Sequence, residues 1–285
     1  MNKQKIEFFA WPNDKGITRI DAGLIRHTRL EEFYDDNDTE KIDSNWQAQL
    51  AAGNFRNLPM GSLWNTRQEN SRIVASYLPT EYKVYNAVAF PHNSNNPPSY
   101  RLRSLMRISS VGGVIFTSDD KILMQKRAEG VTAAGLIDSV VAGFCVSNDK
   151  NKLDFDCAIK EKLKREAVID QKEVSSLEQR SLFSSIGYDF SGMIGYLVKT
   201  TLSSQEIALR ANKKYIGSIY ALKKNEIFDF IARHYIKEQD MTGDGCAVLL
   251  SCLEQSEFED VVEEIKSRGA KIQFGQLSEG KFIPN

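Results

Sequence analysis

Residues 108–116 read Ile108-Ser109-Ser110-Val111-Gly112-Gly113-Val114-Ile115-Phe116, an apolar and β-branched run that predicts a strand. Ser118-Asp119-Asp120 is a turn signal, and the following run at 121–127 predicts the hairpin partner of this strand. After a Gly-marked loop, residues 136–144 predict a further strand, and residues 155–170 predict a charged helix. The chain is therefore expected to be organised around this strand, hairpin, loop and helix.

The remaining patterns extend this unit in both directions. They predict strands at 17–25, 82–90, 182–188, 192–200 and 215–222, and helices at 43–52, 224–234, 243–253 and 258–268. Strands followed by closing helices indicate an α/β (α+β) fold, an α/β/α sandwich with a mixed sheet covered on two faces. Residues 91–99 form the strongest chain-breaking cluster, so we expect a smaller N-terminal α+β domain at 1–105, of unassigned role, and a second domain at 106–285.

Composition excludes several classes of function. The 285 residues carry 37 Lys and Arg against 38 Asp and Glu, a net charge of -1, which argues against general nucleic-acid binding. No stretch of about 18 apolar residues is present, so no membrane span is expected. Four scattered cysteines and three histidines make a structural zinc site an unfavoured prediction, and reduced thiols favour a cytoplasmic protein. Oligomeric state stays open, although the N-terminal domain could contribute to a homodimer.

The central stretch resembles the Nudix superfamily, whose members hydrolyse nucleoside diphosphates linked to another moiety. The resemblance rests on residues 111–115 and 122–127, on Asp138-Ser139-Val140-Val141-Ala142-Gly143-Phe144, and on the helix 157–169. The family signature is G-x5-E-x7-R-E-U-x-E-E-x-G-U, in which U is a bulky apolar residue. The resemblance implies glutamates that hold Mg²⁺ or Mn²⁺ on the pyrophosphate of a small nucleotide-type substrate.

Three registers of this signature compete on the helix. Gly143 matches the opening Gly, and Asp149 follows six residues later, where the family has Glu. In the first register, Lys160-Glu161 stands for Arg-Glu. In the second, Arg165-Glu166 is the literal Arg-Glu and Asp170 lies one turn beyond Glu166. The third aligns residues 166–169 with the end of the signature, so that Val168 replaces its Gly and the helix contains one extra residue.

The resemblance implies a set of site residues. Glu166 is the preferred carboxylate because two of the three registers use it. The implied catalytic residues are Glu166 and Glu161, the implied metal ligands are Glu166, Asp170 and Glu161, and the implied substrate-binding residues are Arg127, Gly143, Lys160 and Arg165.

Basic side chains crowd the same helix. Lys160, Lys162, Lys164 and Arg165 would repel a magnesium ion if they faced the cleft, yet they would still attract a phosphate. An ordinary surface helix with i, i+4 pairs from Glu161 to Arg165 and from Lys162 to Glu166 is the alternative.

Two functions therefore stay open. One is metal-dependent hydrolysis of a pyrophosphate linkage. The other is a protein that kept the fold, lost the metal site and binds a phosphate ligand or a protein partner. They differ in whether two of Glu161, Glu166 and Asp170 point into one cleft with a third acid. Farther along, Thr242-Gly243-Asp244-Gly245 precedes a predicted helix and is interpreted as its N-cap rather than as an anion site.

Overall fold

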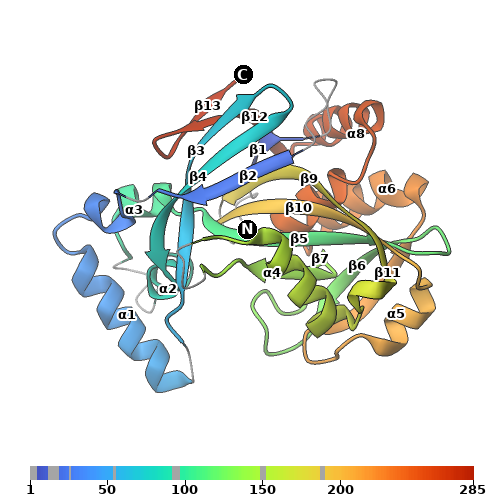
Figure 1. Ribbon diagram of the computed structural model, residues 1–285, viewed down its shortest axis with the longest axis horizontal. Helices are drawn as coiled ribbons and strands as arrows, with labels where there is room; N and C mark the ends of the chain where they lie inside the picture. The colour runs from blue at the N-terminus through green and yellow to red at the C-terminus, as the bar shows by residue number, and fades with distance from the viewer. Residues whose placement is uncertain are drawn as a thin grey trace.

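The computed structural model describes residues 5–11, 19–25, 27–53, 56–91, 97–147, 152–186 and 190–285 (Figure 1). Within these ranges the strands form a 13-stranded sheet whose main path runs β13-β12-β1-β9-β10-β5-β3-β4-β2, with β6, β7, β8 and β11 joined beside it. The strands are β1 (Lys5–Ala10), β2 (Arg19–Leu24), β3 (Pro59–Glu69), β4 (Arg72–Glu81), β5 (Ile108–Phe116), β6 (Ile122–Arg127), β7 (Ile137–Ser139), β8 (Val141–Phe144), β9 (Val174–Ile186), β10 (Ser191–Thr200), β11 (Ile216–Leu222), β12 (Lys271–Ser278) and β13 (Lys281–Pro284).

Strand β5 is the centre of this sheet. It pairs in parallel with β10 and antiparallel with β3, β6 and β8, and its residues are buried from Ile108 to Ile115. The pairs β1–β12 and β2–β4 are also parallel, while β9 runs antiparallel to both of its neighbours. The sheet is therefore mixed, as the sequence predicts.

Helices cover both faces of the central strands. The helices are α1 (Asp38–Ala52), α2 (Tyr82–Ala89), α3 (Tyr100–Leu105), α4 (Phe155–Lys162), α5 (Ser204–Arg210), α6 (Ile227–Ile231), α7 (Gly243–Leu250) and α8 (Gln255–Ser267). On one face, Phe155 and Ile159 of α4 share a core with Val111 of β5. On the other, α6, α7 and α8 share a second core with Val114 of β5 and Phe8 of β1. The predicted mixed α/β fold with helices on two faces is confirmed.

A third core lies at one end of the molecule, where α1, α2 and α3 gather beside β3 and β4 (Figure 1). Its apolar members include Ile42, Met60 and Val84, and a buried hydrogen bond of 2.9 Å joins Asn45 of α1 to Asn86 of α2. A buried amide pair of this kind satisfies polar groups that burial would otherwise leave unpaired.

In the described part of the chain, no helix is long and apolar enough to cross a membrane.

Strands from both sides of residue 105 join the same sheet. β1 lies between β9 and β12, and β3 pairs with β5 at Ser62 and Ile108. The buried Arg107 side chain, just before β5, forms an ion pair of 3.2 Å with the buried Glu7 of β1. The division into domains at 1–105 and 106–285 stays a prediction. The contacts above join residues of the two parts within one sheet.

The structure differs from the sequence-based expectations at several elements. The predicted strand at 82–90 is wrong, because these residues form helix α2, with five consecutive residues from Val84 to Val88 buried. The loose alternation of apolar residues there reflects packing against α1 and β4 rather than a pleated strand. The predicted strand at 136–144 is two strands, β7 and β8, and the predicted helix 43–52 begins earlier, at Asp38. Asp149, most of the 91–99 cluster and residues 187–188 of a predicted strand lie outside the described residues.

Candidate functional site

The helix that resembles the family signature ends in one wide, π-helical turn. Helix α4 ends at Lys162 and continues as the π-helical segment η2 (Leu163–Ala167), and Val168 then adopts a left-handed conformation with φ 56°. A π-turn accommodates one residue more than an α-turn. The left-handed position is where glycine is normally favoured. Both features match the third register, in which the helix holds one extra residue and Val168 replaces the final Gly of the signature.

Lys162 lies against Gly143 at the entrance to this wide turn. Gly143 has φ +139°, a conformation that favours glycine, and a Cβ atom there would stand 2.6 Å from Lys162 Nζ. Lys162 is 8% exposed although it carries an ammonium group. Within the part of the chain that the structure describes, no carboxylate forms an ion pair with Lys162. A nearly buried cation is costly unless it is paired, and an anionic ligand could neutralise this one.

Two arginine–carboxylate pairs lie near this lysine. Arg165 binds the buried Glu166 carboxylate at 2.5 Å and lies over the ring of Tyr215, with its guanidinium carbon 5.3 Å from the ring centre. Arg127, at the end of β6, binds the buried Asp138 carboxylate at 2.7 Å. Each acid is thus matched by an arginine. The excess positive charge of the group resides on Lys162.

The pKa of Lys162 reflects these surroundings. Burial lowers the pKa of its ammonium below the ordinary value, and the neighbouring Arg165 and Arg127 lower it further. The Glu166 carboxylate acts in the opposite direction and raises the pKa of Lys162. An anion bound at Lys162 would also raise this pKa, because it favours the charged form.

The end of the wide turn is fixed by the segment that leads into β11. The backbone N–H of Asn212 donates to the Glu166 carbonyl oxygen at 2.9 Å, and the Asn212 side-chain amide donates to the Arg165 carbonyl oxygen at 3.2 Å. These bonds satisfy carbonyl groups that the α-helical pattern would leave unpaired at a helix end. They hold Arg165 and Glu166 in place beside Lys162.

The other residues expected at the site lie apart from Glu166. Glu161 is exposed and its carboxylate faces the Cys157 sulfur at 3.8 Å. Asp170 is exposed beyond the end of the helix and forms a capping box with Glu173. Lys160 is also exposed, and its role in substrate binding stays a prediction. The structure therefore brings together Gly143, Glu166, Arg165 and Arg127, and it does not bring together the three carboxylates expected on one metal ion.

The donor set around Glu166 does not fit a divalent magnesium or manganese ion. Such ions take several oxygen ligands, and the described residues here supply one buried carboxylate that is already paired with Arg165. The Lys162 ammonium acts electrostatically on the same carboxylate and would repel a dication. No group of three or more His, Cys, Asp or Glu ligand atoms lies within 4.8 Å of one another at this helix, among the described residues.

Lys162 is the residue that the sequence-based interpretation did not include in the site. Its signal is position: Lys162 lies three residues after Ile159 and four before Glu166, on the buried face of the helix. A lysine on an apolar stripe is unusual unless its ammonium group has a function or a partner.

The predicted N-cap at Thr242 is confirmed, because its hydroxyl accepts from the Gly245 N–H at 2.8 Å.

Comparisons with known proteins give structural matches only. No protein-family model and no curated protein matches this chain. Among solved structures, DR0079 from Deinococcus radiodurans matches with 14% identity and a TM-score of 0.39, covering 53% of this chain and 85% of that protein. A MutT protein from Methanosarcina mazei Go1 matches with 14% identity and a TM-score of 0.32, covering 55% and 94%.

A Nudix hydrolase from M. smegmatis, RenU, matches with 10% identity and a TM-score of 0.33, covering 55% of this chain and 86% of the hydrolase. These identities and TM-scores are too low to carry an argument about activity. The fold assignment rests on the strand order and helix packing of the chain itself.

Proposed function

We propose that this chain binds a phosphate-bearing small molecule at the Lys162 site, which consists of Lys162, Gly143 and the pairs Arg165–Glu166 and Arg127–Asp138. The binding requires no divalent metal. The observation that carries this proposal is the Lys162 ammonium, which is nearly buried, lies on the Gly143 backbone and has no ion-pair partner among the described residues. An anionic oxygen would supply the missing partner through a charge-assisted hydrogen bond.

The two arginines add further hydrogen-bond donors to the site. Arg165 is half exposed, with 50% of its side chain accessible, so its guanidinium can turn part of its donor set to a ligand while it still contacts Glu166. A guanidinium offers five N–H donors in a planar fork, and one carboxylate uses only some of them. Lysine and arginine together offer enough donors for a diphosphate, whereas a ligand with a single carboxylate would leave some of them unused.

The resemblance of the helix to the Nudix signature indicates the ligand class. It implies a nucleoside diphosphate derivative, such as a nucleotide sugar or a dinucleotide, because the family acts on that linkage. Metal-dependent hydrolysis of the same linkage is the competing function. It requires oxygen ligands around Glu166, and the Arg165 guanidinium together with the Lys162 ammonium works against that arrangement.

Calorimetric titration with inorganic pyrophosphate and with a nucleotide sugar, in chelator and again with Mg²⁺ or Mn²⁺, tests the proposal. We expect saturable binding in chelator with little change on metal addition, and no phosphate or nucleoside monophosphate released. Binding or turnover that appears only with metal would support the hydrolase instead. Absence of binding under all conditions would contradict both functions.

Matched variants connect this binding to the site. Lys162→Met removes the ammonium and keeps an unbranched chain, so affinity should fall at least about tenfold, the value of one charge-assisted hydrogen bond. Lys164→Met removes the same charge from an exposed position on the same helical segment. It should leave affinity nearly unchanged. An equal loss in both variants would mean that only the general charge of the helix attracts the anion.

A further inference from the structure

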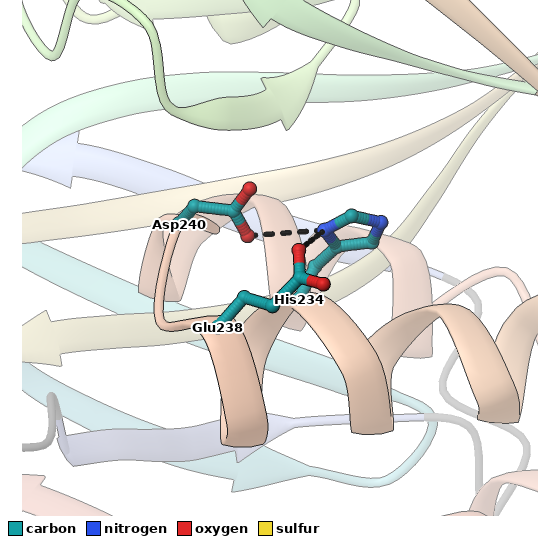
Figure 2. A group of neighbouring side chains, drawn as sticks. All are labelled: His234, Glu238 and Asp240. Carbon is teal, nitrogen blue, oxygen red and sulfur yellow. Dashed lines mark hydrogen bonds and ion pairs between the residues drawn. The ribbon is translucent and has the colours of Figure 1, made fainter.

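Three metal-ligating side chains meet at the end of the π-helix η5 (Ala232–Glu238), in an element separate from the Lys162 site. His234 Nδ1 lies 3.2 Å from Glu238 Oε2 and 3.0 Å from Asp240 Oδ1. Figure 2 shows both carboxylates turned toward the same ring nitrogen. Their ligand atoms all lie within 4.8 Å of one another.

We propose that His234, Glu238 and Asp240 bind a divalent transition metal ion of the zinc class. One imidazole nitrogen and two carboxylate oxygens suit zinc, and a fourth position would be taken by water. Ligand bonds of about 2.0–2.2 Å in tetrahedral geometry separate neighbouring ligand atoms by roughly 3.4 Å. The two separations from Nδ1, 3.0 and 3.2 Å, are close to that value, so small side-chain shifts would suffice.

The backbone holds the three ligands in this arrangement. Gln239 adopts a left-handed conformation with φ 56°, and the N–H groups of Gln239 and Asp240 both donate to the His234 carbonyl oxygen. The chain therefore turns back on itself and returns Asp240 to the imidazole. The imidazole is also fixed, because 9% of the side chain is exposed and its ring centre lies 4.5 Å from that of Phe230. A rigid ring whose nitrogen faces the carboxylates needs little reorganisation to accept an ion.

Arg233 contacts the Glu238 carboxylate from outside the cluster. Arg233 Nε donates to Glu238 Oε1 at 2.8 Å, which leaves Oε2 directed at the imidazole. An arginine that orients a ligating carboxylate acts as the outer support that metal sites commonly contain. Arg233 offsets the charge of Glu238, so a cation here would be attracted mainly by the Asp240 carboxylate.

A metal ion here would act as a structural clamp. The Asp240 carbonyl oxygen accepts from the Ile137 N–H at 2.7 Å, and Met241 forms a parallel bridge with Ile137 of β7. The ion would tie the end of η5 to the segment that runs along β7 into α7. The site is thus expected to raise stability rather than to perform chemistry.

Cobalt titration of the full-length protein tests this site, because Co²⁺ replaces zinc and reports its ligands by visible absorption. Cys157, the exposed free thiol, is replaced in all proteins by Cys157→Ser so that its thiolate cannot bind Co²⁺. We expect one equivalent of Co²⁺ with the spectrum of a nitrogen and oxygen ligand set, displaced by Zn²⁺. A thermal shift that grows with Zn²⁺ concentration should accompany it.

The variants separate a built site from surface charge. Asp240→Asn removes one ligand charge with little change of shape, and its affinity for Co²⁺ should fall at least about tenfold. Asp229→Asn removes the same charge from an exposed position on α6 and should bind as the parent does. His234→Asn should abolish binding, and circular dichroism checks that it folds. No saturable Co²⁺ binding by the parent, or equal binding by parent, Asp240→Asn and Asp229→Asn, would overturn the proposal.

Discussion

Lys162 Nζ lies 2.6 Å from the point at which a Cβ atom on Gly143 would stand. The absence of a side chain on Gly143 is therefore what gives the lysine its place. The backbone of Gly143, with φ +139°, also adopts a conformation that other residues rarely take. A strand residue and a helix residue are matched to each other at this contact, and the proposed anion site depends on it.

Gly143→Ala should disturb both members of this contact. The strained backbone conformation costs about 1–3 kcal/mol of unfolding free energy, and the new methyl group displaces the lysine ammonium. We expect lower stability in chemical denaturation and weaker pyrophosphate binding. Gly130→Ala introduces a similar backbone cost, at φ +80°, where no atom lies within 4 Å of the new Cβ. Equal stability losses without a difference in binding would contradict the role assigned to Gly143.

Lys162→Met should stabilise the protein at neutral pH, by about 1–3 kcal/mol, because it removes the charge of a nearly buried lysine that has no ion-pair partner among the described residues. The folded state lowers the pKa of Lys162 below its ordinary 10.5, so the unfolded state binds more protons between the two pKa values. The stability of the parent protein relative to the variant therefore rises with pH through that window. The advantage of the variant is largest below the folded-state pKa and disappears above 10.5.

Urea denaturation of the two proteins across this pH range measures that difference directly. All other lysines are common to both, so their titration cancels. An advantage that grows with pH, or a variant less stable than the parent at neutral pH, would show that Lys162 has a partner that compensates its charge.

Val168→Gly should stabilise the protein by about 1 kcal/mol, because a β-branched residue in the left-handed region is strained. Val146→Gly is the control. Val146 is exposed to a similar extent, 39% against 41%, and has no positive φ, so glycine there should destabilise by increasing the entropy of the unfolded chain. Thermal unfolding of both variants provides the comparison. Destabilisation by both would contradict the strain at Val168.

Arg165→Glu should weaken pyrophosphate binding and strengthen Mn²⁺ binding. The substitution places a second carboxylate beside Glu166, where the signature in the third register has an acidic residue, and it removes a cation from the Lys162 site. Pyrophosphate affinity should fall at least about tenfold while Mn²⁺ affinity rises, measured by calorimetry and by electron paramagnetic resonance. Unchanged Mn²⁺ binding would mean that Lys162 alone is sufficient to exclude the metal.

Arg107→Met should destabilise the protein strongly. It leaves the buried Glu7 carboxylate with Lys5, at 2.7 Å, as its only remaining ion-pair partner among the described residues. Loss of one member of a buried pair costs roughly 3 kcal/mol or more, and the double change Glu7→Leu with Arg107→Met should recover much of it. Denaturation of the three proteins tests this. A double variant as unstable as the single one would locate the cost in the lost hydrogen bonds from Arg107 to the Ser104 and Gly280 carbonyl oxygens instead.

The sequence predicts the central part of the fold well because its signals are local. The run at 108–116, its hairpin partner and the helix after Asp154 depend on periodicity, turn residues and capping, which neighbouring residues encode. Helix α2 is different. Its residues 84–88 are all buried between other elements, so they show no clean period, and the tertiary environment decides the conformation.

The site was predictable in part for the same reason. Gly143, Glu166, Arg165 and Arg127 were expected there, and the structure places them near Lys162. The π-turn after Lys162 is held by hydrogen bonds from Asn212, far along the chain, and no local pattern reports it. Asp240 likewise meets His234 only because the backbone reverses at Gln239.

The most direct test of the account is a titration of a nucleotide sugar into the parent protein in chelator, at about pH 9, in two buffers of different ionisation enthalpy. With an adenine nucleotide sugar, neither the diphosphate nor the base titrates in that range, so proton uptake on binding reports a protein group. We predict uptake by the parent, because a bound anion raises the pKa of Lys162, and its loss in Lys162→Met. Binding that takes up no protons, or takes up as many in Lys162→Met, would contradict the assignment of Lys162 as the anion-binding group.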